Sequence, residues 1–235
     1  MAEVTSAAHP NRLIAGLPER ERQRLLSGGE PVELICGDVL CVADTPLRYV
    51  YFPHSGFVSL VASVSGHQPL DLGIIGSEGM LGATIVLGVN AVPLRCIVYG
   101  SGLALRVSAS QFKHELVRSP ALLRTMHRYL YVMMAQLAQA FTCIHFHEVN
   151  ARLARCLLMT HDCAHASHFH LTHQFLANML GVRRSGISTA ASALQARGLI
   201  DYTRGEIQIL NRNGLEAASC ECYAASINDY AQRLN

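Results

Sequence analysis

Hydrophobic and polar positions divide the chain into stretches of different period. From Pro31 to about residue 105, short apolar or alternating runs are separated by turn signals such as Cys36-Gly37-Asp38 and Ser65-Gly66-His67. Many short strands with turns at near-regular spacing are typical of a β-sandwich or β-barrel. We expect strands at 32–35, 39–42, 49–52, 57–64, 70–75, 94–99 and 103–107, preceded by one short helix at 11–26.

The middle of the chain has an apolar repeat with alternating spacings of three and four. Its members are Leu123, Met126, Leu130, Met133, Leu137, Ala140 and Ile144. This repeat predicts one long helix that packs in parallel on a second copy of itself, so we expect a homodimer. The flanking positions are largely uncharged, which indicates that the helix also packs on its own β domain. A buried helix without a partner is the alternative, but the strict 3.5-residue period favours the dimer.

A helix-turn-helix pattern follows at residues 171–200. Thr172 is a suitable N-cap for a first helix, and Gly181 falls where a tight turn needs a positive φ. The second helix has an apolar face and an opposite face of hydroxyl side chains, with arginines at its start. Two β runs around Arg204-Gly205 then predict a hairpin wing.

Local charge supports DNA as the partner of this segment. The whole chain has a net charge of only +2, but residues 171–212 contain five arginines and two acidic residues. Small hydroxyl side chains with leading arginines suit a helix that enters the major groove. The alternative is a helical hairpin that only packs or contacts protein. The candidate DNA-binding residues are Arg183, Arg184, Ser185, Ser188, Thr189 and Arg204.

These motifs and their order resemble the Crp–Fnr superfamily of bacterial transcription regulators. The resemblance implies an α+β chain: a β jelly-roll sensor similar to cyclic-nucleotide-binding domains (1–118), a dimerisation helix (119–147) and a winged helix-turn-helix domain (148–235). It also implies a pseudo-palindromic double-stranded DNA operator and RNA polymerase as partners. Arg184 matches a DNA-contacting arginine of the family. Ser185 and Thr189 replace a base-reading glutamate and another arginine, so the family's known operators are not expected here.

The sensor departs from the family's cyclic-nucleotide site. The resemblance places a phosphate-cradling turn at residues 76–84 and a phosphate-binding arginine at Arg95, for which a salt bridge or a surface position is the alternative. The ribose-binding glutamate is replaced by Ala83, unless Glu78 takes its place from a different register. Leu137 and Ala138 stand where adenine-contacting hydroxyls would be. A lost hydrogen-bond partner in a buried site costs roughly 1–3 kcal/mol. We therefore expect no cyclic-AMP binding, and a small-molecule effector of unknown identity. The effector-binding candidates are Glu78, Gly82 and Arg95.

A metal ion or a redox signal is the alternative to a small-molecule effector. His161, Cys163, His165, His168, His170 and His173 crowd into the segment 161–173, which would make the protein a metal- or redox-responsive regulator if they bound an ion. Their spacings match no established motif, so a solvated loop is the interpretation adopted, with no metal ligand and no cofactor. The family's iron–sulfur site needs clustered N-terminal cysteines, but no cysteine precedes Cys36. Cys220 and Cys222 are expected to be structural or solvent-facing.

The remaining expectations are negative. No nucleophile elbow, phosphate loop or metalloprotease signature is present, so an enzyme is not expected. Residues 1–10 lack the features of a signal peptide. The longest apolar stretch, 129–141, is shorter than the roughly 20 residues that span a membrane. We expect a cytoplasmic protein with no membrane contact.

Overall fold

The computed structural model describes residues 11–164 and 167–234. Its N-terminal half contains two antiparallel sheets, with strand orders β1-β7-β3 and β2-β6-β4-β5. The strands are β1 (Gly29–Leu34), β2 (Val39–Cys41), β3 (Tyr49–Pro53), β4 (Phe57–Ala62), β5 (Leu70–Ile75), β6 (Arg95–Gly100) and β7 (Gly102–Ser108). Inward side chains of both sheets form one core, which includes Phe52, Val58 and Val107. The seven expected strands are confirmed.

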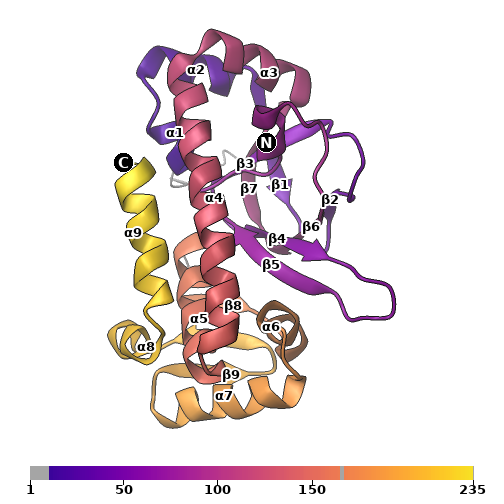
Figure 1. Cartoon of the computed structure of the whole chain (residues 1–235). Coiled ribbons are helices and arrows are strands. Elements are labelled where there is room, and N and C mark those ends of the chain that lie inside the picture. Colours follow the sequence, from indigo (N-terminus) through magenta and orange to yellow (C-terminus); the bar gives the residue numbers. More distant parts are fainter. Residues whose placement is uncertain (1–10, 165–166, 235) are drawn as a thin grey trace, which may run out of the picture.

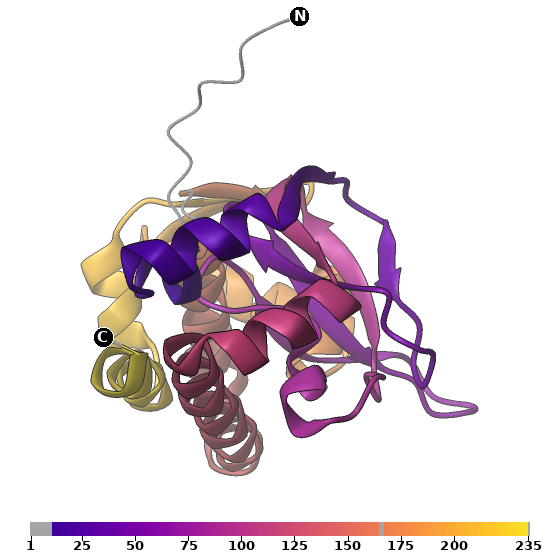
Figure 2. The ribbon, with the colours of Figure 1, turned by 90° about the horizontal axis from the view of Figure 1, so that it is seen from above.

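Helices cover one end of this β domain (Figures 1 and 2). They are α1 (Arg12–Ala15), α2 (Glu19–Ser27) and α3 (Ala109–Arg118), with a short 3-10 helix η1 (Ala83–Leu87) between β5 and β6. The prediction of one leading helix is wrong, because Gly16, Leu17 and Pro18 interrupt it. Proline lacks the backbone N–H that continues a helix, and Pro18 instead caps α2.

A single helix, α4 (Pro120–Phe146), runs the length of the molecule and joins its two halves (Figure 1). Ser119 caps its start by accepting a hydrogen bond from the backbone N–H of Leu122. One face of α4 packs on the β domain through Leu122, Met126 and Tyr129, all buried within the chain. The last helix, α9 (Cys222–Leu234), lies beside another face of α4 (Figures 1 and 2).

The C-terminal half has its own core. It comprises α5 (Val149–Ala164), β8 (His168–His170), α6 (His173–Leu180), α7 (Arg184–Ala196), β9 (Ile200–Thr203), β10 (Glu206–Ile209) and α8 (Arg212–Ala218). The sheet order is β8-β10-β9, so β8 adds a third strand to the expected hairpin. The segment 161–173, expected to be a solvated loop, is therefore partly regular: α5 reaches Ala164, and 168–170 is a strand. In the described ranges, none of the helices combines the length and apolar character needed to cross a membrane.

Candidate nucleic-acid interface and sensor cavity

The helix-turn-helix consists of α6 and α7, which we call the reading head together with the wing (β9, β10 and their turn). Both helices begin and end where the sequence indicates. The Thr172 hydroxyl caps α6 by accepting a hydrogen bond from the backbone N–H of Phe175 at 3.1 Å. Gly181 ends α6 with φ +61°, a conformation that favours glycine. Arg183 is the N-cap of α7, but its side chain makes no capping hydrogen bond. The buried face of α7 consists of Ile187, Ala190, Ala191 and Leu194, as predicted.

The opposite edge of α7 is open to solvent. Arg183, Arg184, Ser185 and Thr189 are exposed, whereas Ser188 is half-buried. The Thr189 hydroxyl donates to the Ser185 carbonyl at 3.1 Å, and the Ser188 hydroxyl lies 3.2 Å from the Arg184 carbonyl. Two arginines at the start of a helix with short hydroxyl side chains along the same edge form a surface suited to phosphate and base-edge contacts.

His173 is a residue of this site that the sequence analysis did not assign to it. Its Nδ1 lies 3.0 Å from the Ser188 hydroxyl, and its ring packs on Tyr202 with centroids 4.5 Å apart. Burial, with a smaller contribution from the positive charge of Arg184, lowers the pKa of His173. His173 therefore favours its neutral form and joins α6, α7 and the wing.

The wing is a two-residue hairpin in which Thr203 pairs with Glu206. Arg204 and Gly205 both have positive φ, +54° and +90°, and the Arg204 side chain is exposed. A Cβ at Gly205 would lie 2.8 Å from the ring of the exposed His170, and the φ of +90° is a conformation that side-chain-bearing residues rarely adopt, so glycine is favoured there. The tip of the wing thus presents Arg204 to solvent, as predicted.

Comparison with known proteins agrees with this architecture. Residues 151–218 match the family model of the Crp-like helix-turn-helix domain. By sequence, none of the curated proteins matches the chain. Solved structures also share this fold, among them the following three. Residues 151–218 are therefore a Crp-like helix-turn-helix domain, and the predicted resemblance to the Crp–Fnr superfamily is confirmed.

The first is the c-di-GMP-responsive global regulator CLP of Xanthomonas campestris, 18% identical, with a TM-score of 0.65 over 82% of this chain and 99% of that one. FixK2 of Bradyrhizobium japonicum is 16% identical, with a TM-score of 0.68 over 82% of this chain and 98% of that one. A CRP/FNR-family regulator of Thermus thermophilus is 21% identical, with a TM-score of 0.66 over 81% and 98%. These likenesses confirm the α+β fold, with an N-terminal sheet-rich domain, a long helix and a C-terminal helix-turn-helix domain.

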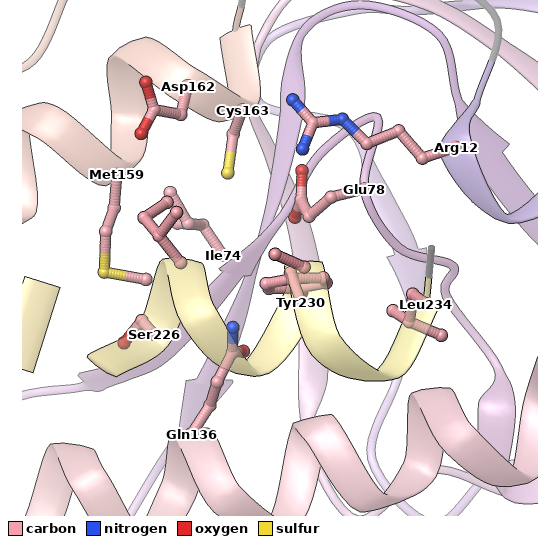
Figure 3. Close-up of a pocket in the computed structure, with 12 residues that line it drawn as sticks. Arg12, Ile74, Glu78, Gln136, Met159, Asp162, Cys163, Ser226, Tyr230 and Leu234 are labelled. Atoms are coloured by element: carbon pink, nitrogen blue, oxygen red, sulfur yellow. The ribbon is translucent and has the colours of Figure 1, made fainter. Parts of the chain in front are cut away.

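The candidate effector residues do not converge on one pocket. Glu78 is buried and accepts a hydrogen bond from the backbone N–H of Gly76 at 2.9 Å. Its carboxylate lies in a cavity of about 130 Å³, where the guanidinium of Arg12 and the thiol of Cys163 point toward it (Figure 3). Burial raises the pKa of Glu78, opposed mainly by hydrogen bonds from the backbone. Glu78 thus participates in an internal contact between the β domain and α5.

Gly82 and Arg95 lie elsewhere. Gly82 has φ +92° and lines a separate cavity of about 510 Å³ between the β domain, α4 and α5. The walls of this cavity are mainly apolar and include Leu60, Met80, Ala83 and Met133. Its charged lining residues are Asp71, Arg152 and Arg155, and Arg152 donates a hydrogen bond to the Leu180 carbonyl. Arg95 is exposed on β6 and does not line either cavity. The large cavity therefore has no arginine at the position where the family resemblance placed one.

Among the described residues of segment 161–173, the histidines and the cysteine do not form one cluster. Asp162, beside His161, is bound by Arg212 at 2.8 Å. His168 and His170 contact Glu206 on the wing, and Cys163 points away from them toward Glu78. His165 lies outside the described residues. Cys220 and Cys222 are 6% and 1% exposed, so the solvent-facing alternative for them is wrong.

The exposed apolar face of α4 only partly matches the predicted dimer seam. Met126 is 0% exposed and packs in the chain's own core, so it is not available to a second copy, and this assignment is corrected. Leu123, Leu130 and Met133 are partly buried, whereas Leu137 and Ile144 are open. Two residues outside the predicted seam, Met134 and Phe141, are 69% and 77% exposed. The open apolar stripe is Leu130, Met134, Leu137, Phe141 and Ile144, of which Leu130 is partly buried. It keeps the 3.5-residue period and three residues of the predicted seam, but has Met134 and Phe141 in place of Met133 and Ala140.

Proposed function

We propose that this chain is a sequence-specific, DNA-binding transcription regulator of the Crp–Fnr type. The observation that carries the proposal is the edge of α7, where Arg183, Arg184, Ser185 and Thr189 are all exposed while the opposite face is buried. Arg184 is the candidate for base contacts, and Arg183 and Arg204 for phosphate contacts. Ser188 is engaged with His173, so we assign it to positioning α7 more than to contacting bases.

The regulator acts as a homodimer through α4. The open stripe defined above offers five apolar side chains, four of which are at least half exposed: Met134, Leu137, Phe141 and Ile144. Apolar surface at this spacing is stabilised by burial against a second helix. A dimer places two copies of α7 on one face of a DNA duplex. It therefore favours a pseudo-palindromic operator with half-sites about one helical turn apart.

The proposed input is a small molecule other than cyclic AMP. A ribose and a phosphate need polar partners, but the large cavity is walled mainly by apolar side chains, and Arg95 is outside it. The proposed domains are the sensor (1–118), the dimerisation helix (119–147) and the winged helix-turn-helix domain (148–235). The proposed partners are double-stranded DNA and RNA polymerase in the cytoplasm, and no catalytic role is proposed.

The experiment is a selection of binding sites from random DNA duplexes with the full-length protein, followed by titrations at two salt concentrations. We expect a pseudo-palindrome, and an affinity that falls as salt rises because bound phosphates release counterions. A variant with both Arg184→Ala and Arg204→Ala should lose most of this binding. The matched control is Arg118→Ala on α3, outside the reading head, which should bind like the wild type. Equal binding by all three proteins, or none by any, would refute the proposal.

A further inference from the structure

A cluster of metal-ligand side chains lies where α4 meets the connection between α8 and α9. Cys143 and His147 come from the end of α4, Cys220 from the connection, and Cys222 from the first residue of α9. One potential ligand atom of each of these four residues lies within 4.8 Å of those of the other three. The Cys143 and Cys220 sulfurs are 3.6 Å apart, and the Cys222 sulfur is 3.5 Å from Nδ1 of His147.

These separations fit a tetrahedral site. With Zn–S bonds of about 2.3 Å and Zn–N bonds of about 2.0–2.1 Å, tetrahedral angles place neighbouring ligand atoms roughly 3.5–3.8 Å apart. A disulfide between Cys143 and Cys220 would need about 2.05 Å, so at 3.6 Å the two sulfurs are not bonded. The three cysteines are nearly inaccessible to solvent, which leaves no open coordination position for a substrate.

Surrounding groups complete the geometry of a metal site. The Glu221 carboxylate lies 3.1 Å from Nε2 of His147, the ring nitrogen opposite the one that faces Cys222. A carboxylate behind a histidine is the usual arrangement that fixes the tautomer of a ligating imidazole. The Gln139 amide donates to the Cys222 sulfur at 2.8 Å, a bond that a thiolate accepts more strongly than a thiol does.

Charge is also balanced nearby. Three thiolates and a neutral imidazole around a divalent cation carry one net negative charge. Arg155 of α5 interacts electrostatically with Cys143. Its side chain is half-buried, its Nη2 donates to the Ser226 hydroxyl at 3.4 Å, and its Nε is buried without a hydrogen-bond partner among the described residues. The negative charge of the loaded cluster would therefore stabilise this partly buried guanidinium.

We propose that Cys143, His147, Cys220 and Cys222 bind one Zn²⁺ per chain in a closed structural site. Three sulfurs and one nitrogen in a tetrahedron select Zn²⁺ over hard cations that prefer oxygen. The ion links the end of the long helix to the segment that follows the Crp-like domain. It thereby fixes the orientation of that domain relative to α4. This site differs from segment 161–173 and does not depend on DNA binding.

The sequence contains two signals for this site, neither of which is sufficient alone. Cys143 and His147 are four residues apart, so on a helix they share one face, and Cys220 and Cys222 form a C-x-C pair. The two pairs are separated by more than seventy residues. Only the packing of α9 along α4 brings them together.

The first test measures the metal content of full-length protein purified under reducing conditions, without added chelator. We expect one zinc per chain in the wild type. Cys222→Ser should lose it. The control Cys36→Ser changes an exposed cysteine outside the cluster and should retain it. Circular dichroism of each variant separates loss of metal from failure to fold.

The second test does not depend on a cysteine variant that folds. Wild-type protein stripped of metal is titrated with Co²⁺, which should give thiolate charge-transfer absorption and intense visible bands of tetrahedral cobalt that saturate at one equivalent. Glu221→Gln should keep the spectrum but weaken binding by about 10–100-fold, as expected for loss of a group behind a ligating histidine.

Three results would overturn the proposal. The first is wild-type protein without metal and without a cobalt charge-transfer band. The second is an unchanged metal content or cobalt spectrum in Cys222→Ser. The third is stoichiometric iron or copper at these ligands in place of zinc. All readouts are taken without DNA, so they are independent of the proposed regulatory function.

Discussion

His173 and Ser188 connect the two helices of the reading head through a hydrogen bond of 3.0 Å between Nδ1 and Oγ. The Ser188 hydroxyl also lies within hydrogen-bond distance of the Arg184 carbonyl, so it donates to that carbonyl while accepting from a protonated Nδ1. Nε2 of His173 is buried and has no hydrogen-bond partner among the residues that the structure describes. A bare nitrogen there is tolerated better than an N–H without an acceptor, so the neutral ring is favoured.

This arrangement predicts a pH dependence of stability. Since the pKa of His173 is lowered in the folded state, the unfolded chain binds the proton more readily. The contribution of His173 is thus fully present above the unfolded pKa of about 6.5. It is lost as pH falls toward and through the lower folded value. Urea unfolding at about pH 7.5 and about pH 5.5 should show a smaller acid loss in His173→Gln than in wild type.

His54 supplies the control for that measurement. Burial lowers its pKa too, but it lies in the β domain. His54→Gln should therefore retain the acid sensitivity that comes from His173. An identical pH dependence in wild type and His173→Gln would contradict the assigned ionisation of His173.

Arg184 and Arg204 should have different roles in DNA binding. Arg184→Ala should weaken operator binding by roughly 1–3 kcal/mol and relax specificity at one base pair per half-site, because a bidentate contact to guanine is lost. Arg204→Ala should weaken binding to all DNA sequences alike. It should also flatten the salt dependence of the affinity, because a protein that makes one phosphate contact fewer releases fewer counterions on binding. Site selection with each variant at two salt concentrations measures both effects. The assignment fails if Arg184→Ala keeps the wild-type base preferences while Arg204→Ala changes them.

The exposed stripe on α4 predicts a dimer interface that differs from the seam predicted from the sequence, and substitutions in the stripe test it. Leu137→Asp with Phe141→Asp would bury four carboxylates in a dimer, at a cost of several kcal/mol, so sedimentation should detect monomers. Val117→Asp on α3 is the control, because Val117 is 87% exposed and lies outside α4. A double variant that still sediments as a dimer would place the interface elsewhere.

Calorimetry should detect no cyclic-AMP binding at micromolar concentrations. The reason is the apolar lining of the large cavity and the position of Arg95 outside it. A lost polar partner costs roughly 1–3 kcal/mol, and several are missing here. Micromolar or tighter binding that Gly82→Val abolishes would contradict this prediction. Gly82 lines that cavity, and its φ of +92° is unfavourable for a residue with a side chain, so the substitution would disturb the cavity wall.

Local sequence was sufficient for features that depend on short-range physics. Thr172 and Gly181 mark the ends of α6 because a cap and a left-handed residue satisfy backbone groups within a few positions. The alternating runs predicted the strands, and the apolar repeat predicted the long helix, since period alone distinguishes these elements. The dipeptide Arg204-Gly205 predicted the wing turn, because a two-residue hairpin turn needs positive φ and glycine adopts it readily.

The tertiary structure decided which face of each element is free and which distant residues meet. Met126 and Phe141 both fit an apolar helix face in the sequence, yet the β domain covers Met126 completely and leaves Phe141 77% exposed. Glu78 and Arg95 belong to one expected site but lie apart, because Glu78 turns inward to Arg12 and Cys163. Cys143 and Cys220 meet only because α9 folds back along α4. Contacts between residues so far apart depend on how whole elements pack, and the local pattern does not encode that packing.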